Sequence, residues 1–195
     1  MNHLDQLPQL HNYATLAAMP HTDWGKRREY VKERGWFLLS YETALDLARC
    51  LKHRKVIEVG AGSGHLAAHL RKLGVKDYKA YDINLLTRGH GGYQFYRNFG
   101  VMHRNALQVN IKSADAIVMT WPNYDDNFAY RIAKKMRPGQ WLFYQGEWRG
   151  CTACDKFHDL LQTDFREVGH MCDRLNKYQV NWQGIRDQWF VFRKK

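Results

Sequence analysis

The sequence predicts an α/β fold built around a mostly parallel β-sheet with crossover helices. Strand-like and helix-like segments alternate from residue 55 to residue 165, which is typical of parallel strands joined by helices. A glycine-rich loop follows the first of these strands, where α/β proteins often bind ligands. Near the C-terminus two strand-like segments come in succession, which predicts an antiparallel hairpin added to the sheet.

The N-terminal part has a different pattern. The first 54 residues read as helical, and we expect them to form an extension of a single domain that spans residues 1–195. Leu4, Leu7 and Leu10 suggest one apolar stripe. Residues 40–52 place apolar side chains at helical spacing behind Ser40, whose hydroxyl suits the N-cap position. Residues 55–195 then form the α/β core.

The elements of the core follow from the spacing of its apolar residues. Short apolar runs predict strands, and apolar residues that recur every three or four positions predict helices. The predicted strands cover residues 55–60, 78–82, 114–121, 139–147, 165–172 and 187–194. The predicted helices cover residues 65–73, 126–136 and 155–165.

The composition is that of a globular protein with an unusually basic charge balance. The formal net charge of +11 favours association with polyanions such as nucleic acid. Alternatively, the basic residues only solvate helix faces, because just residues 25–34 and 193–195 are clustered. No apolar run approaches the roughly 20 residues of a membrane span, and the polar N-terminus does not read as a signal peptide. With four cysteines, a reducing cytoplasmic location is the expectation.

The most informative stretch is VIEVGAGSGHLAAHL, which begins at Val56. An apolar strand runs into Gly60, Gly62 and Gly64, and a helix begins directly afterwards. Glycines there permit a tight turn and a close approach of the backbone to a ligand. A dinucleotide fingerprint would place its third glycine where this sequence has His65, so no pyrophosphate site is required.

With Glu58 two residues before the first glycine, this loop resembles the Glu/Asp-x-Gly-x-Gly-x-Gly motif of the class I S-adenosylmethionine-dependent methyltransferases. Asp82 matches the family's acid at the end of the second strand, which accepts from both ribose hydroxyls. Asn105 matches the residue after the third strand that accepts from the adenine amino group. The resemblance covers roughly residues 40–195. Another nucleotide ligand, or a loop without a ligand, is the alternative.

The resemblance implies S-adenosylmethionine as cofactor and a Rossmann-like, seven-stranded sheet with helices on both faces. The sheet would be mostly parallel with an antiparallel C-terminal hairpin, and the extra N-terminal helices have no counterpart in it. Ile83 and Ala106 would pack on the adenine. The implied cofactor-binding residues are Glu58, Gly60, Ala61, Gly62, Gly64, Asp82, Ile83, Asn105 and Ala106.

The loop after the predicted strand 114–121 reads Trp121-Pro122-Asn123-Tyr124. It resembles the Trp-Pro-Pro-Tyr tetrad of a methyltransferase-like group of unknown substrate, with Asn123 in place of the second proline. Base amino-methyltransferases carry Asn, Asp or Ser at the first position, whose oxygen orients the target amine. Trp121 has a donor and no acceptor, so it lacks that function. We therefore expect Trp121, Pro122 and Tyr124 to form an aromatic wall for the substrate, the alternative being that the aromatics simply pack.

Three residues are candidates for a direct part in catalysis. Glu147 follows the predicted strand 139–147 and is the best general-base candidate, while Tyr124 would lie on the same side of the sheet. His65 could face the sulfonium or amino-acid end of the cofactor. The plain alternatives are a loop ion pair for Glu147 and a surface position for His65.

The cysteines and histidines near residue 151 could supply the ligands of a zinc site. The residues are Cys151, Cys154, His158, His170 and Cys172. Cys154 leads directly into a helical pattern, and a single residue separates the last two, so we expect packed cysteines and no metal.

Together these observations predict an S-adenosylmethionine-dependent methyltransferase. The charge favours a nucleic-acid acceptor and the compact size a small-molecule acceptor, and both stay open. Two rivals remain: an enzyme that cleaves S-adenosylmethionine on the same fold, and a non-catalytic module whose basic face holds nucleic acid or a protein partner.

Overall fold

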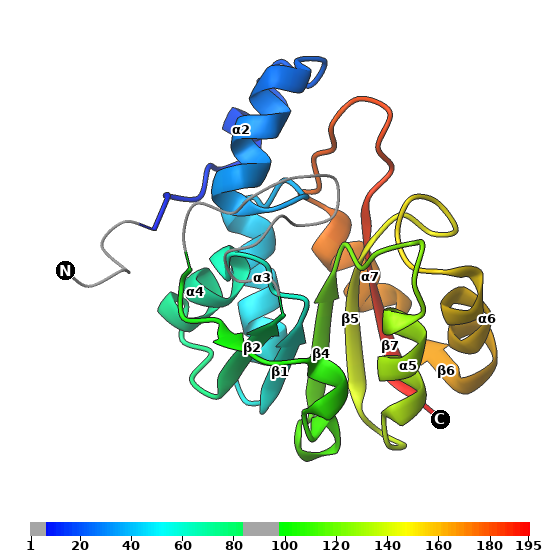
Figure 1. Cartoon of the computed structure of the whole chain (residues 1–195). Coiled ribbons are helices and arrows are strands. Elements are labelled where there is room, and N and C mark those ends of the chain that lie inside the picture. The colour runs from blue at the N-terminus through cyan, green and yellow to red at the C-terminus, as the bar shows by residue number, and fades with distance from the viewer. Residues whose placement is uncertain (1–6, 84–97) are drawn as a thin grey trace.

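The computed structural model describes residues 7–83 and 98–195. The protein is built around a twisted, seven-stranded sheet. The strands lie in the order β3-β2-β1-β4-β5-β7-β6 (Figure 1). They are β1 (Val56–Val59), β2 (Tyr78–Asp82), β3 (Met102–His103), β4 (Ala116–Thr120), β5 (Trp141–Gly146), β6 (Phe165–Glu167) and β7 (Gln188–Lys194).

The pairing of the strands confirms the predicted sheet. Strand β1 runs parallel to β2 and β4, β3 runs parallel to β2, and β5 runs parallel to β4. Strand β7 runs antiparallel to both of its neighbours, β5 and β6. All four residues of β1 are buried, as expected for a central strand covered on both faces.

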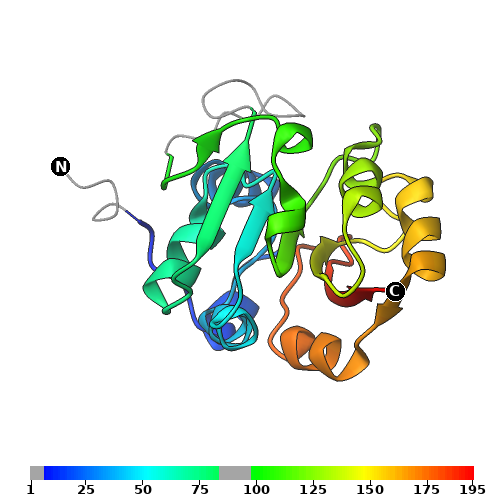
Figure 2. The ribbon, with the colours of Figure 1, turned by 90° about the horizontal axis from the view of Figure 1, so that it is seen from below.

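Helices cover both faces of the sheet (Figure 2). The helices are α1 (Tyr13–Ala17), α2 (Trp24–Arg34), α3 (Tyr41–Leu51), α4 (His65–Lys72), α5 (Phe128–Lys135), α6 (Asp155–Asp164) and α7 (Gly169–Asn176). Two short 3-10 helices, η3 (Ala106–Gln108) and η4 (Ile111–Ser113), connect β3 to β4. None of the helices in the described ranges has the length and apolar character of a membrane span.

Two buried clusters, one on each face, hold these layers together. On one face α3, α4 and α7 pack on the strands, with Leu47 and Leu70 completely buried. On the other face α5, α6 and the two 3-10 helices do the same, through side chains such as Ile132 and Leu161. Helix α3 is therefore part of the core although it precedes the first strand.

The predicted strand 165–172 is wrong beyond its first three residues. Strand β6 ends at Glu167, and α7 begins at Gly169. The buried side chains of α7, Cys172 and Leu175, are three positions apart, which is a helical spacing. The C-terminal strands β6 and β7 are antiparallel as predicted, but a helix joins them in place of a hairpin turn.

The N-terminal expectations are met in part. Ser40 is the N-cap of α3, and its hydroxyl accepts from the Thr43 N–H at 3.1 Å. The expected helical stripe is wrong for residues 7–12, which form no regular secondary structure, although Leu7 is buried. Leu4 lies outside the described residues. Helix α2 stands at the upper end of the molecule, beside the segment that precedes β7 (Figure 1), and Leu38 forms an isolated bridge with Val180.

Candidate functional site

A cavity of about 410 Å³ opens at the carboxyl ends of β1, β2 and β4. Strand β1 lies between β2 and β4, so the order in which the strands are added to the sheet reverses at this point. The loops separate at such a point, and open α/β sheets bind their ligands there. The walls come from four regions of the chain. They are residues 34–37, residues 58–63 with 65–66, residues 81–83 with 104–107, and residues 120–123 with 126–128 and Arg131.

The glycine loop forms the floor of this cavity and is fixed to the end of β2. The N–H groups of Gly60 and Ala61 both donate to the Tyr81 carbonyl, at 2.9 and 3.1 Å. The Gly62 N–H donates to Oδ2 of Asp82 at 2.8 Å. Gly60 and Gly62 have φ values of 70° and 55°, which L side chains adopt at a cost.

The position of Gly64 favours packing over the expected contact with the cofactor. It does not line the cavity, and its φ of 78° places it against the chain at residues 99–101. A Cβ added there would lie 2.4 Å from Cγ2 of Val101 and 3.3 Å from the Phe99 carbonyl oxygen. The geometry thus leaves no room for a side chain at the third glycine unless Val101 moves.

Glu58 lies beneath the loop, and its side chain is almost completely buried. Its Oε2 accepts from the Tyr78 hydroxyl at 3.1 Å. Burial raises the pKa of Glu58 to about 8, because the hydrogen bond from Tyr78 offsets only part of the desolvation. At neutral pH the protonated carboxyl is therefore the main form.

The residues expected near adenine and ribose do come together. Asp82, Ile83, Asn105 and Ala106 all line one end of the cavity, beside β2 and β3. Ile83 is 53% exposed, which leaves an apolar face towards the opening. Asn105 caps η3 by accepting from the Leu107 N–H at 2.9 Å, and this fixes the position of its amide.

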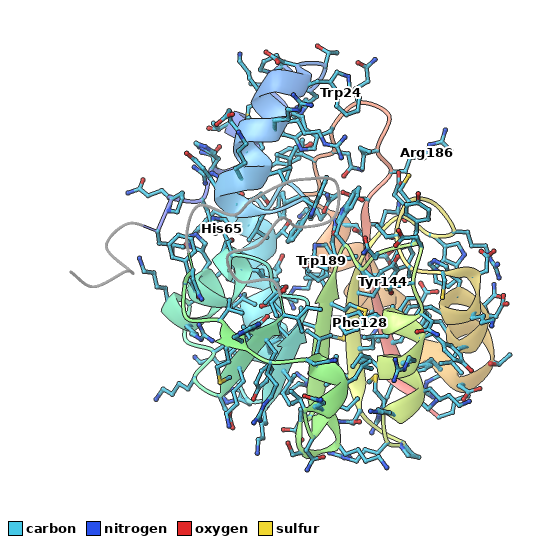
Figure 3. The ribbon with its side chains drawn as sticks, viewed as in Figure 1. Trp24, His65, Phe128, Tyr144, Arg186 and Trp189 are labelled. Carbon is cyan, nitrogen blue, oxygen red and sulfur yellow. The ribbon has the colours of Figure 1, made fainter. Side chains whose placement is uncertain are left out.

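His65 lines the cavity from the first turn of α4 (Figure 3). Only 2% of the residue is exposed, so its expected alternative as a surface residue is wrong. Its Nε2 has no hydrogen-bond partner within the described parts of the chain. Burial, with a smaller effect from the neighbouring His69 ring at 4.6 Å, lowers the pKa of His65 well below its usual range. The imidazole is therefore neutral at physiological pH.

Trp121 forms the wall at the opposite end, next to β4. Its ring is stacked on Trp36, with the ring centroids 5.4 Å apart and the planes at 12°. Its indole N–H donates to Oδ2 of Asp187 at 2.9 Å. The φ of Trp121 is 47°, a strained value for a bulky residue, and the Asp187 bond and the stack hold it there. Pro122 also lines the cavity, as expected.

The N-terminal chain completes this wall, which the sequence did not indicate. The cavity is lined by Arg34, the last residue of α2, and by Gly35, Trp36 and Phe37, which follow it. In α2 itself, the guanidinium carbon of Arg27 lies 5.0 Å from the centre of the Trp24 ring and 5.9 Å from that of Trp121. Figure 3 shows Trp24 at the outer end of α2, away from the sheet.

Tyr124 is not part of the described cavity wall. It is 62% exposed, and the residues that line the cavity from its loop end at Asn123 and resume at Asp126. The preceding residue, Asn123, forms an isolated antiparallel bridge with Thr152. In this conformation Tyr124 lies outside the wall that Trp121 and Pro122 form.

Glu147 is also absent from the described lining of the cavity, and it is buried, with 8% of the residue exposed. Its Oε1 accepts from the Arg186 N–H at 2.7 Å, and its Oε2 accepts from the Cys151 N–H at 2.9 Å. Burial alone would raise the pKa of Glu147, but these backbone donors outweigh it and lower the pKa. The geometry therefore favours a structural function, in which Glu147 joins two loops, over the expected general base.

The cysteines and histidines considered for zinc have other contacts. Nε2 of His158 lies 3.1 Å from the Thr152 carbonyl oxygen, and the Val191 N–H donates to Sγ of Cys172 at 3.2 Å. Cys151 is exposed and Cys154 half-buried. In the residues that the structure describes, no three His, Cys, Asp or Glu side chains gather as metal ligands would.

Helix α5 supplies a further wall that the sequence did not indicate. Phe128, its first residue, lines the cavity, and its ring lies 3.8 Å from where a Cβ on Gly60 would be, so the ring is next to the glycine loop. Arg131, one turn later, and Asp126, just before the helix, lie at the rim. Only the position of the helix after β4 could have suggested them.

No protein-family description and no curated protein matches the sequence. Among solved structures, the chain is similar to human N-acetylserotonin methyltransferase in complex with S-adenosylmethionine, at 15% identity and a TM-score of 0.50, over 98% of this chain and 65% of that one. The N-methyltransferase NodS of Bradyrhizobium japonicum WM9 matches at 18% identity and a TM-score of 0.49, over 77% of this chain and 92% of that one.

The chain thus spans just under two thirds of the human enzyme's length. At these identities the similarity concerns the fold alone. The chain has the fold of the class I S-adenosylmethionine-dependent methyltransferases.

Proposed function

We propose that the protein is an S-adenosylmethionine-dependent methyltransferase. The observation that carries this proposal is the glycine loop at the carboxyl end of β1, bonded through the Gly62 N–H to Asp82 at the end of β2. This pair of elements lies in one cavity with Asn105 and with the unpartnered Nε2 of His65. An acid, a glycine loop and an amide so arranged suit a nucleoside joined to an amino acid.

The residues present fit such a cofactor. The volume of about 410 Å³ lies within the roughly 300–1,000 Å³ of small-molecule sites. Asp82 would accept from the ribose, and Asn105 would meet the adenine edge between Ile83 and Ala106. Gly60, Ala61 and Gly62 allow a close backbone approach, and Glu58 and His65 offer polar atoms at the loop. The bound cofactor would supply an electrophilic methyl group.

The acceptor would enter at the other end of the cavity. Strand β4 is three positions from β3 in the sheet, so the two ends are roughly 14 Å apart at about 4.8 Å per strand. Trp36, Phe37 and Trp121 give the β4 end an aromatic wall, which suits an acceptor that carries a flat ring. Such a ring occurs in small metabolites and in an extruded nucleic-acid base.

Catalysis at this site would depend mainly on positioning. Methyl transfer requires an in-line approach of the nucleophile, and holding two reactants in that geometry accounts for much of the rate. The neutral His65 is a weak proton acceptor, because its pKa is so low. We therefore assign it to hydrogen bonding with cofactor or acceptor through Nε2, and expect an acceptor that is nucleophilic at neutral pH, such as an aromatic amine or a thiolate.

Isothermal calorimetry with S-adenosylmethionine tests the cofactor. Asp82→Ala should weaken binding at least tenfold, because it removes both the expected ribose acceptor and the Gly62 anchor. Asp77→Ala, an exposed aspartate just before β2, is the matched control and should bind normally. If the folded, unaltered protein binds no S-adenosylmethionine, the proposal is wrong.

Product analysis then separates transfer from its rivals. Incubation with methyl-labelled S-adenosylmethionine and pools of RNA, DNA, protein and metabolites should leave adenosylhomocysteine and one labelled pool. Methylthioadenosine would instead indicate cleavage of the cofactor. Tight binding without either product would favour a non-catalytic module.

A further inference from the structure

A second hollow lies at the opposite edge of the sheet from the cavity. It has a volume of about 380 Å³ and is lined by His53, Arg54, Asp115, Arg137, Gly139 and Trp141. Asp115 and Trp141 lie where the parallel strands β4 and β5 begin, whereas the cavity lies where β1, β2 and β4 end. No step proposed for methyl transfer uses this hollow.

Three arginines run from the hollow across the edge of the sheet. The guanidinium carbon of Arg54 lies 4.8 Å from the centre of the Trp141 ring, and that of Arg193 lies 5.6 Å from it. In the sheet, Arg193 on β7 pairs with Trp141 on β5 and with Arg166 on β6. Arg54, Arg193 and Arg166 are hereafter the arginine strip.

The positive charge of the strip is not neutralised by the described chain. Within residues 7–83 and 98–195, no carboxylate lies within ion-pair distance of these three arginines. The carboxylate of the hollow, Asp115, is 3.8 Å from Arg137 and also accepts from the Lys55 N–H at 2.9 Å. Like charges that face each other across two strands are destabilising. The Arg193–Arg166 pair therefore has a cost that a bound anion would remove.

The guanidinium groups nearest the hollow are already held in place. Arg54 donates to the Cys50 carbonyl, and Nε of Arg193 donates weakly to the Gly139 carbonyl at 3.4 Å. Their contact with Trp141 fixes them further, so little side-chain freedom is lost when they bind a ligand. Each keeps N–H groups beyond these bonds, in the fork geometry that matches phosphate oxygens.

We propose that the arginine strip and its hollow bind the phosphodiester backbone of a nucleic acid. The guanidinium groups of Arg54 and Arg193 lie against the Trp141 ring, so this ring is not available to stack on a base. The site therefore recognises phosphates and not bases, and binding is independent of the nucleotide sequence. Several cations in a row suit a polyanion better than a single phosphate, and the net charge of +11 is of the right sign. Because the strip is remote from the cavity, this inference does not rest on the proposed methyl transfer.

Fluorescence anisotropy with a labelled 20-nucleotide single-stranded RNA, and with DNA of the same sequence, tests the site. The triple variant Arg54→Gln/Arg166→Gln/Arg193→Gln removes the strip. The control Lys26→Gln/Arg28→Gln/Lys76→Gln removes the same charge from exposed residues elsewhere. Salt is varied from 50 to 200 mM, and circular dichroism with urea unfolding checks that each variant keeps its fold.

We expect the triple variant to lose at least tenfold in affinity at 100 mM salt. The slope of log affinity against log salt should fall by about 2, at about 0.7 for each lost phosphate contact. The control should keep most of its affinity, and inorganic triphosphate should compete only weakly. Equal losses in both variants, no binding by the unaltered protein at 50 mM salt, or binding of triphosphate alone would each overturn the proposal. If the triple variant does not fold, Arg166→Gln on the edge strand should still lower the slope.

Discussion

Replacing Gly64 by alanine tests why the glycine loop needs its third glycine. The new Cβ would lie 2.4 Å from Cγ2 of Val101, with the backbone at a φ of 78°. The left-handed backbone costs about 1–2 kcal/mol in a residue with a Cβ, and overpacking costs about 1–3 kcal/mol. We therefore expect Gly64→Ala to lower the free energy of unfolding by about 2–5 kcal/mol.

Urea unfolding followed by tryptophan fluorescence measures this loss. Gly74→Ala is the matched control, because Gly74 has a φ of 94° and no atom within 4 Å of the added Cβ. It should lose only the backbone cost of about 1–2 kcal/mol. The difference between the two variants is then the steric cost of meeting Val101.

A double-mutant cycle identifies the partner. Val101→Ala removes the clashing methyl groups, so Gly64→Ala should cost about 1–3 kcal/mol less in that background than in the natural one. If Gly64→Ala costs no more than Gly74→Ala, or if Val101→Ala gives no relief, then the loop does not depend on this packing and the argument fails.

Two further changes test the buried polar groups. The pKa of Glu58 is about 8 in the folded chain against an ordinary 4.5, so its contribution to stability is complete below pH 4.5 and is lost as the pH rises through 8. Relative to Glu58→Gln, the unaltered protein should thus lose stability between pH 5 and 8 in denaturant titrations, and a constant difference would contradict this. Trp121→Phe keeps the stack on Trp36 but leaves the buried Asp187 without its indole donor, which should cost about 1–3 kcal/mol of unfolding free energy at pH 8. Asp187→Asn in that background should recover part of the loss.

Local sequence patterns were sufficient to predict most of the sheet and one end of the cavity. The glycine loop and Asp82 are adjacent in the fold because parallel neighbours end at the same edge, and the periodicity of the sequence already implied such neighbours. Segment 165–172 was ambiguous, since its apolar residues at 165, 168, 171 and 172 also fit a helix. The helix is favoured because it buries Cys172 and Leu175 against the sheet.

The other end of the cavity could not be predicted in the same way. Trp36 and Trp121 are separated by 85 positions along the chain, and no local pattern indicates that they stack. Likewise the position of Glu147 suggested a base at a strand end, but the two N–H groups that its carboxylate accepts from belong to residues 151 and 186. Contacts over such sequence separations are set by the tertiary fold.

The position of α3 has a consequence for how the chain unfolds. Because α3 covers the same sheet face as α4 and α7, a fragment that begins at residue 55 would expose the part of that face that α3 covers. Residues 34–37 continue the same segment to the cavity wall, so a cofactor bound there would touch both halves of the chain. A cofactor bound in the cavity should therefore raise the melting temperature of a single unfolding transition of the whole chain, and not that of a separate subdomain.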